Sequence, residues 1–332
     1  MATSEQAYGA VATLGVVGGG VIGAGWAARA LAAGLDVVAW DPDRDGERRL
    51  RAGVANAWPA LTRVGLDPKA DPDRLRVAGS LAELAGTADF VQESAPERLD
   101  LKTRLIAEIA ATAPADVLIA SSTSGLLPSD FQAAARSPTR VLVGHPFNPV
   151  YLLPLVELVA GKRTAAAAID AAAAFYRSLG MAPLKVRVEV PGFLSDRLQE
   201  ALWRENLHLL NDGVATTAEL DEAIRLGPGL RWALMGTNQI FALAGGPDGM
   251  RHFVEQFGPD HAFPWTRLEP PAMNDTLALR LIDGTEAQAE GRSVAELERL
   301  RDDCLISILE ALADFETGAG KVLAEWRARP RS

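Results

Sequence analysis

Cysteine is almost absent from this sequence. Cys304 is the only cysteine among the 332 residues, so the chain cannot form an internal disulfide. Such sparse use of cysteine is typical of proteins in a reducing cytosol, and it favours a cytoplasmic location. Cys304 lies in an apolar helical pattern, DDCLISILEAL. We expect it to be a small buried side chain rather than a catalytic nucleophile.

Long apolar runs and an excess of positive charge are also missing. The chain has no apolar run of about 18 residues, so we predict no membrane span. Its first ten residues, MATSEQAYGA, lack a basic segment, and we expect no signal peptide. The net charge is −10, which makes nucleic acid and anionic membranes poor partners but suits a cationic small-molecule substrate. The 48 % hydrophobic and 23 % charged fractions are typical of a soluble globular protein.

What the sequence does contain is a glycine-rich stretch from Leu14 to Asp41, LGVVGGGVIGAGWAARALAAGLDVVAWD. Its pattern predicts a strand, a tight turn, a helix, a second strand and an acid. Gly18, Gly20 and Gly23 have the G-x-G-x-x-G spacing of dinucleotide-binding loops. Gly18 permits the tight turn, Gly20 lets the backbone approach a pyrophosphate, and Gly23 lets the helix lie close to the strand.

Groups suited to a dinucleotide flank these glycines. Val21 and Ile22 begin the helix, and the N–H groups of its first turn would face the phosphates. Asp41 can accept hydrogen bonds from ribose hydroxyls and would repel a 2′-phosphate, so NAD is favoured over NADP. We predict further cofactor contacts from Glu93 and Lys102 in DFVQESAPERLDLK. The alternative is a glycine-rich turn without a ligand, but the flanking strands and the acid favour NAD.

Up to about residue 190, apolar strand patterns alternate with helical patterns. This alternation predicts an α/β Rossmann fold with a doubly wound parallel sheet. Ligands of such sheets bind at the carboxyl ends of the strands, where Glu93, Ser121 to Ser124 and His145 are expected. The expected strands cover residues 14–17, 37–40, 75–78, 88–92, 116–120, 141–144, 152–159 and 183–188.

The pattern changes near Pro191, after which only helices and loops are indicated. We therefore predict an NAD-binding domain over residues 1–190 and an all-helical domain for substrate and dimerisation over residues 191–332. Trp58-Pro59 should bend or end an earlier helix, and the basic tail from Trp326 should fray. The expected helices of the second domain cover residues 193–211, 217–226, 232–244, 250–257, 277–284 and 293–314, the last with a capping box at 293–296.

Four histidines are candidates for proton transfer, and one stands apart. His145 follows an apolar strand in the rigid polar stretch GHPFNPV, whereas His208, His252 and His261 lie in helical patterns and are interpreted as structural. Glu157 interrupts the apolar run VYLLPLVELVA, where a carboxylate needs a partner such as an imidazole. A glutamate that points to solvent from a strand edge is the alternative.

These motifs together resemble the L-3-hydroxyacyl-CoA dehydrogenase superfamily over nearly the whole chain. The resemblance rests on GGGVIGAGWA, Asp41, STSG, GHPFNPV, Glu157 twelve residues after His145, and PGFLSDRL. It implies that His145 and Glu157 form a catalytic dyad and that Ser124 and Asn148 contact the substrate oxygen. It also implies a homodimer formed through the helical domain. We predict no metal site.

Two departures from the family pattern bear on the substrate. Asp196 stands where the family motif G-F-x-x-N-R has asparagine, and an ionised aspartate there would favour a cationic substrate. The alternative is an aspartate that only caps a helix or pairs with Arg197. The segment after Asp41 is short and poor in lysine, unlike that of relatives that bind coenzyme A.

The wording of several motifs narrows the resemblance to members that oxidise a 3-hydroxy acid carrying a quaternary ammonium group. Aromatic rings and a carboxylate would suit that cation, so we predict substrate contacts from Phe147, Tyr151, Asp196 and Trp232. Each of these aromatic residues could equally belong to the core. Members that act on an acyl-CoA or on L-gulonate remain an alternative. A non-catalytic dinucleotide-binding protein is a further one, although the His145–Glu157 pair argues against it.

Overall fold

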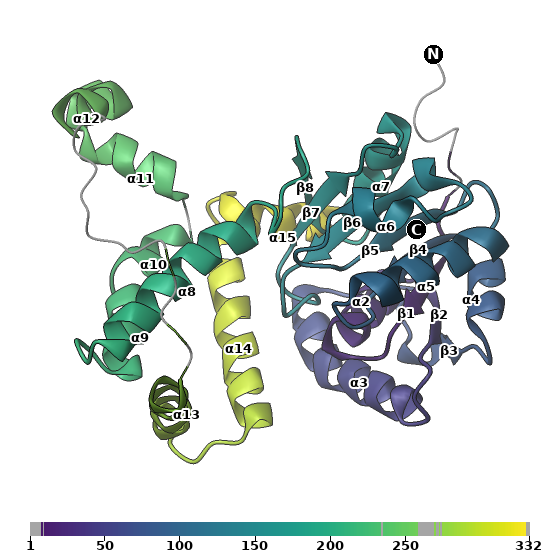
Figure 1. The fold of residues 1–332 in the computed structure, drawn as a ribbon, viewed down its shortest axis with the longest axis horizontal. Helices are drawn as coiled ribbons and strands as arrows, with labels where there is room; N and C mark the ends of the chain where they lie inside the picture. The colour runs from purple at the N-terminus through teal and green to yellow at the C-terminus, as the bar shows by residue number, and fades with distance from the viewer. Residues whose placement is uncertain are drawn as a thin grey trace. The chain divides into compact units, whose positions relative to one another are not determined.

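The strands form a single eight-stranded sheet in the order β3-β2-β1-β4-β5-β6-β7-β8 (Figure 1). They are β1 (Thr13–Val17), β2 (Asp36–Trp40), β3 (Leu75–Val77), β4 (Phe90–Glu93), β5 (Leu118–Ser121), β6 (Val141–Pro146), β7 (Leu155–Ala160) and β8 (Ala182–Val186). The chain order reverses between β1 and β4, as in doubly wound sheets. The predicted Rossmann fold class is confirmed.

One neighbouring pair of strands is not parallel, and here the prediction of a parallel sheet is wrong. β6 and β7 are antiparallel, with His145 opposite Glu157 in the register. The cause is the short connection over residues 147–154, which contains no crossover helix, and a parallel connection needs a longer crossover.

The computed structural model describes residues 8, 10–233, 235–257, 269, 272 and 274–329. Their contacts divide the chain into two compact units, one of residues 1–194 and 322–332 and the other of residues 195–321. The predicted helical domain, 191–332, included the terminal segment that the structure places with the first unit. Within the described parts of the chain, no helix combines the length and apolarity needed to cross a membrane.

Helices cover both faces of the sheet in the first unit. These are α2 (Val21–Ala32), α3 (Gly46–Val64), α4 (Leu81–Thr87), α5 (Leu99–Thr112), α6 (Pro128–Gln132) and α7 (Ala166–Ser178), with short 3₁₀ turns at Pro72–Arg74 and Pro138–Arg140. α2 packs on α3 and meets α7, where the rings of Trp26 and Tyr176 lie 5.3 Å apart. α4, α5 and α6 pack in succession and share a buried apolar cluster with the strands. The sheet is therefore the middle layer of three.

Two expectations for helices of the first unit are wrong. Pro59 does not end α3, which continues to Val64 because the proline lies on its exposed side and removes only one N–H donor. The tail does not fray at Trp326. α15 (Gly318–Ala328) includes it, and the buried Trp326 indole donates to the carbonyl of Gly65 at 2.8 Å.

The described part of the second unit contains helices and no strand, as predicted. Its helices are α8 (Ser195–Asn211), α9 (Thr217–Arg225), α10 (Pro228–Trp232), α11 (Thr237–Ala244), α12 (Gly249–Phe257), α13 (Asp275–Ala289) and α14 (Val294–Ala313), with a 3₁₀ turn at Gly246–Asp248. The capping box at Ser293 and Glu296 is confirmed. The predicted helix over 232–244 is instead two helices, and Gly236 caps the second one.

Cys304 is exposed on α14, so the expectation that it is buried is wrong. The buried residues of this helix are Asp302, Ile306, Leu309 and Leu312, which follow helical spacing along one side. Cys304 falls two residues after Asp302 and so lies away from that side. An apolar sequence context did not determine which side of the helix faces the core.

Candidate active site

The glycine-rich loop between β1 and α2 has the geometry that a dinucleotide requires. Gly18 has a φ of +101°, and a Cβ there would lie 2.7 Å from the carbonyl oxygen of Ser94. A Cβ on Gly23 would collide with the carbonyl oxygen of Gly18. At Gly20, by contrast, a Cβ would meet no described atom within 4 Å. Two glycines are thus needed for packing, and the third leaves the backbone open for close approach.

The start of α2 is suited to an anion. Gly20 is the N-cap residue, and no side chain of the described part of the chain caps the helix. Val21 is exposed and Ile22 is half-buried. The first N–H groups of the helix are therefore satisfied by no capping side chain, and a pyrophosphate is a natural partner for them.

Asp41 lies directly after β2, beside this loop. Its carboxylate accepts hydrogen bonds from the backbone N–H of Gly19 at 2.7 Å and of Asp43 at 2.8 Å. A small cavity adjoins it, lined by Gly19, Ala39, Trp40, Asp41, Gly46, Glu47, Leu50 and Val77. A carboxylate fixed beside a cavity at the end of β2 fits the adenosine ribose of a dinucleotide.

Glu93 and Lys102, the two further cofactor contacts predicted above, form a buried ion pair. The Lys102 ammonium is 3.0 Å from one Glu93 oxygen and 3.1 Å from the other, and both side chains are buried. Ser121 donates its hydroxyl to the same carboxylate at 2.5 Å, and the N–H of Ala95 donates at 2.6 Å. The pair joins the ends of β4 and β5 to α5, and its contact with the cofactor stays a prediction.

Glu97 is a residue of this edge that the sequence did not single out. Its carboxylate accepts from the N–H groups of Ser124 at 3.2 Å and Gly125 at 3.1 Å, and from the hydroxyl of Thr123. It thereby fixes the loop that carries the exposed Ser124. The sequence does indicate that such a residue is needed, because a polar STSG turn requires an acceptor for its N–H groups.

His145 and Glu157 form the predicted pair. They lie opposite each other on β6 and β7, with Nδ1 of the imidazole 3.2 Å from a Glu157 oxygen. Their exposed fractions are 4 % and 0 %. The other carboxylate oxygen accepts the N–H of Leu194 at 3.1 Å. A buried carboxylate with two such partners can fix an imidazole in one tautomer.

Two aromatic rings pack around this pair. The Phe147 ring lies 5.2 Å from the imidazole, and that of Phe193 lies 5.6 Å away. Phe193 is fully buried although its φ is +47°, which a non-glycine residue rarely adopts. Phe193 was not among the predicted site residues, and the glycine before it in PGF is the only local sign of its role.

Buried polar groups support the strand ends below the site. The hydroxyl of Ser122 accepts from Nε1 of Trp26 at 3.1 Å and from Nε2 of Gln92 at 2.7 Å. Tyr176 donates to the Gln92 carbonyl oxygen at 2.6 Å, and burial raises the pKa of this phenol well above its usual value. The phenol therefore stays protonated and acts as a donor.

The comparisons with known proteins agree with this geometry. A model of the 3-hydroxyacyl-CoA dehydrogenase NAD-binding domain matches residues 13–190, and one of the C-terminal domain of the same enzymes matches residues 192–278. The chain belongs to the 3-hydroxyacyl-CoA dehydrogenase family. It is an NAD-dependent dehydrogenase of 3-hydroxy acids, and NAD is its cofactor.

Individual members of this dehydrogenase family are similar over most of the chain. An L-carnitine dehydrogenase of Pseudomonas aeruginosa is 61 % identical over 315 residues, which cover 95 % of this chain and 98 % of that protein. One from Bacillus cereus is 51 % identical over 304 residues, covering 92 % and 93 %.

Solved structures show the same fold. A 5-formyl-3-hydroxy-2-methylpyridine 4-carboxylic acid 5-dehydrogenase, an NAD-dependent dismutase, has a TM-score of 0.78 at 25 % identity, covering 91 % of this chain and 99 % of its own. The (S)-3-hydroxybutyryl-CoA dehydrogenase of Ralstonia eutropha has a TM-score of 0.62 at 30 % identity, covering 83 % and 95 %.

The other predicted site residues of the dehydrogenase differ in their surroundings. Asn148 is exposed after β6, as a substrate contact requires. Tyr151 is buried, and its backbone carbonyl accepts from Nη1 of the buried Arg29 at 2.8 Å. Its substrate contact stays a prediction. Asp196 on α8 and Trp232 on α10 belong to the second unit and remain predictions.

Two of the remaining histidines lie on described helices of the second unit. His208 is buried on α8, and its Nε2 lies within hydrogen-bond distance of the Glu269 carbonyl, so its structural interpretation agrees with the fold. His252 is exposed on α12. His261 lies outside the described residues.

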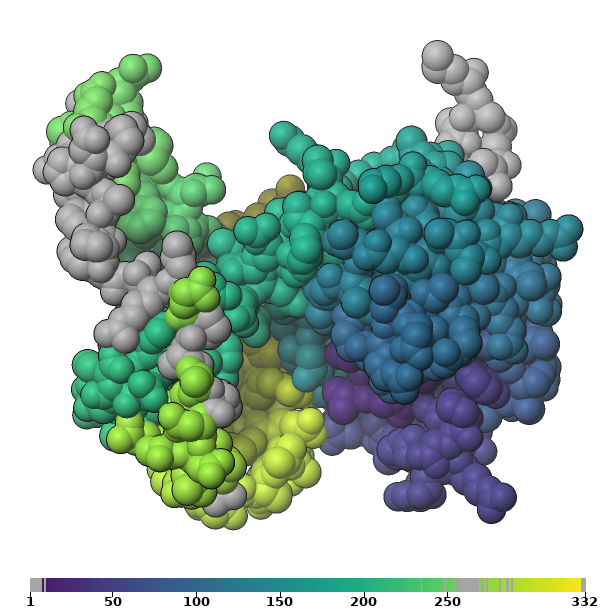
Figure 2. Space-filling view, in the orientation of Figure 1, coloured from purple at the N-terminus to yellow at the C-terminus, as the bar shows by residue number. Residues whose placement is uncertain are grey.

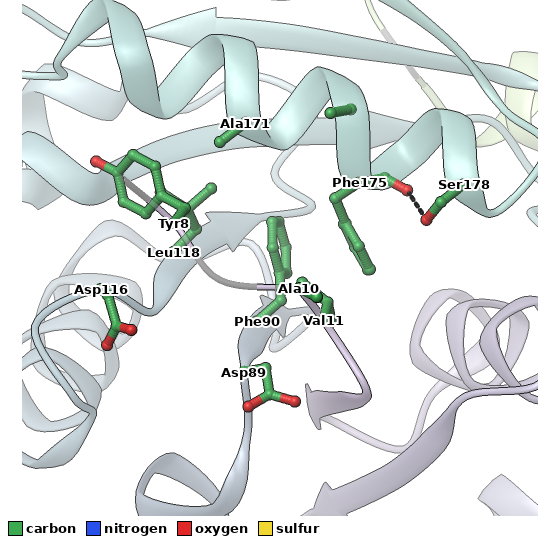
Figure 3. A pocket seen from close by; sticks show the side chains of 11 residues that line it. Tyr8, Ala10, Val11, Asp89, Phe90, Asp116, Leu118, Ala171, Phe175 and Ser178 are labelled. Carbon is green, nitrogen blue, oxygen red and sulfur yellow. Dashed lines mark hydrogen bonds between the residues drawn. The ribbon is translucent and has the colours of Figure 1, made fainter. Parts of the chain in front are cut away.

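A second cavity, of about 370 Å³, lies at the opposite edge of the same sheet. Figure 3 shows side chains from the starts of β4 and β5 and from α7 around it. It contains none of the predicted site residues. Its lining consists of Tyr8, Ala10, Val11, Asp89, Phe90, Asp116, Leu118, Ala171, Ala174, Phe175 and Ser178.

Proposed function

We propose that the enzyme oxidises the 3-hydroxyl group of L-carnitine to 3-dehydrocarnitine with NAD. The observation that carries this proposal is the similarity to relatives named L-carnitine dehydrogenase, which are 51 % to 61 % identical over most of the chain. Lower identity to the 3-hydroxybutyryl-CoA enzyme, at 30 %, favours the carnitine substrate over an acyl-CoA.

The dyad supports general base catalysis. Because Glu157 engages Nδ1, Nε2 of His145 is the atom that would take the proton of the substrate hydroxyl. The carboxylate would then stabilise the imidazolium that forms. NAD, when bound, supplies the acceptor for the C3 hydrogen and its electron pair. We propose that Ser124 and Asn148 orient the substrate oxygen, since both are exposed at the ends of β5 and β6.

L-carnitine has a quaternary ammonium group at one end and a carboxylate at the other. An aromatic face and a carboxylate suit the ammonium, which has no N–H to donate. Phe147 is half-buried beside His145 and is the candidate from the first unit, while Asp196 and Trp232 are the candidates from the second. We propose that Phe147 contacts the cation.

A substrate panel tests the proposal. NADH formation would be followed at saturating NAD with L-carnitine, L-gulonate and 3-hydroxybutyryl-CoA. We expect turnover with L-carnitine at a kcat/KM at least about a hundredfold above that of the others, the scale of a site built for one polar substrate. Turnover of the acyl-CoA or of gulonate without carnitine would refute the substrate. NADH binding without any turnover would indicate a non-catalytic protein.

We also propose a cytoplasmic homodimer formed through the helical unit. The single exposed cysteine is compatible with a reducing compartment. Large apolar side chains are exposed on the helices of the second unit, Leu198 and Trp203 of α8 among them. A second copy is the occupant implied by the family resemblance. Light scattering on the full chain would give the mass, and a monomer at micromolar concentration would contradict the dimer.

A further inference from the structure

An arginine lies beside the acid that selects NAD. Arg49 is in the first turn of α3, and its Nη1 pairs with an Asp43 oxygen at 2.7 Å. Its Nη2 lies 3.7 Å from an Asp41 oxygen. The Arg49 side chain is 42 % exposed, and α3 contributes to the surface of the first unit in the purple-blue part of the colour range (Figure 2).

The N-terminus of α3 is pressed against the same acid. A Cβ on Gly46, the first residue of this 19-residue helix, would lie 2.5 Å from the Cβ of Asp41. A Cβ on Gly19 would lie 2.8 Å from the carbonyl oxygen of Gly46. The N-terminus of α3, the Arg49 guanidinium and the Asp41 carboxylate therefore lie close together at the end of β2.

These groups have opposite preferences for the two cofactors. The adenosine ribose of NAD carries a 2′-hydroxyl, which can donate to a carboxylate. That of NADP carries a 2′-phosphate, which a carboxylate repels but a guanidinium and a helix N-terminus attract. In this structure Arg49 instead pairs with two carboxylates, those of Asp41 and Asp43. Hydrogen bonds from the N–H of Asp45 and from Arg49 lower the pKa of Asp43, so its carboxylate stays ionised.

We propose that Arg49 is a latent binding group for a 2′-phosphate, and that Asp41 and Asp43 together mask it. Asp41 would exclude the phosphate by charge, and Asp43 would neutralise the guanidinium that could bind it. The preference for NAD then depends on a three-residue cluster rather than on Asp41 alone. This inference concerns the cofactor and is independent of the substrate.

Binding of NADH and NADPH to the full chain would test it, measured by titration of nicotinamide fluorescence. The variant D41N/D43N removes both charges, and the single amide oxygen left at position 41 can still accept one of the two N–H groups, of Gly19 or of residue 43, that Asp41 accepts now. The same background would carry R49Q or, as the matched control, R48Q. Arg48 is the neighbouring arginine and pairs with Asp45 instead, at 3.2 Å.

We expect D41N/D43N to bind NADPH at least about tenfold more tightly than the unmodified chain does, the scale of one charge-assisted contact. Adding R49Q should remove that gain, and adding R48Q should keep it. If the double variant does not fold, the single variant D41N replaces it. D41N should show a smaller gain in NADPH affinity, which R49Q should also remove. A gain that survives R49Q, or no gain in a variant that still binds NADH, would overturn the proposal.

Discussion

The two units of this chain differ in how many of their large apolar side chains are exposed. The first unit buries most of them in its three layers, where buried polar groups such as Gln92 and Tyr176 bond to each other. The second unit has a small buried cluster of Leu207, Leu210 and Leu277. It leaves many apolar residues exposed, namely Leu198, Leu202, Trp203, Val214, Leu226, Leu230, Trp232, Phe241, Leu243, Met250, Leu279, Ile282, Val294, Leu300, Ile308 and Phe315.

This difference separates two roles. A unit that satisfies its own core can fix a loop, an imidazole and a carboxylate to a fraction of an ångström, because close-packed interiors resist displacement. A unit with exposed apolar helices gains stability from whatever covers them. We therefore expect substitutions in the first unit mainly to lower the rate of the reaction. Substitutions on the second unit should mainly weaken the dimer.

The largest expected effect is on chemistry in the first unit. His145→Gln should lower kcat by at least about a hundredfold, because a positioned acid–base group contributes about 10²–10⁴ in rate. NADH affinity should stay within about threefold, since the glycine loop is unchanged. Steady-state rates and fluorescence titration would measure both, with His252→Gln on α12 as the control. Near-normal turnover in His145→Gln would remove His145 from the mechanism.

The next effect tests whether the first unit satisfies its own interior. Arg29 is buried and donates to the carbonyls of Leu179, Tyr151 and Gly180, and burial lowers its pKa to about 10, so it remains charged at neutral pH. Arg29→Ala would leave these acceptors unpaired and should lower the free energy of unfolding by roughly 3 kcal/mol. Urea denaturation would measure the loss, and the exposed Arg177→Ala should change little. Equal stability of both variants would contradict this account.

The third effect tests the second unit. Leu198→Glu with Leu202→Glu places two charges on exposed apolar positions of α8 and should weaken the dimer at least about thirtyfold, the scale of one strong interface residue. Binding of NADH should persist. Light scattering over a dilution series would follow the mass, and Gln199→Glu on the same helix is the matched control. An unchanged dimer would assign the interface to another surface.

The smallest effect concerns pH and the helix starts of the second unit. Hydrogen bonds from Thr216 lower the pKa of Glu219, and hydrogen bonds from Ser293 lower that of Glu296. Depressed folded-state pKa values stabilise the fold above the unfolded pKa of 4.5, and that contribution is lost as pH falls through the folded values. Glu296→Gln should therefore flatten the dependence of Tm on pH below about 5, by about 1–4 °C. Melting curves in a pH series would show whether the Tm of Glu296→Gln departs from that of the unmodified protein.

Much of the first unit could be predicted from the sequence because its signals are local. Strand and helix periodicity located all eight strands, and the spacing of Gly18, Gly20 and Gly23 indicated the cofactor. The pairing of His145 with Glu157 followed from the cost of an unpaired buried carboxylate. That argument required a partner but not the antiparallel register that provides it.

The remainder depends on contacts between distant residues. Glu97 is identified only when the loop after β4 brings it to the STSG loop, and Phe193 only when the chain turns back on β6 and β7. Burial of Lys102 and Tyr151 likewise follows from neighbours far away in the sequence. Residue type and spacing therefore indicated where the site would form but not which side chains would face a ligand.

The return of the chain from Val322 onward to the first unit has a genetic consequence. In coding terms the helical unit is an insertion, flanked on both sides by sequence for the coenzyme-binding unit. A stop codon after Lys321 would remove Trp326 from Gly65 and damage the coenzyme-binding unit while sparing the helical one. A gene for the first unit alone must therefore join two coding segments that are separated in the natural sequence.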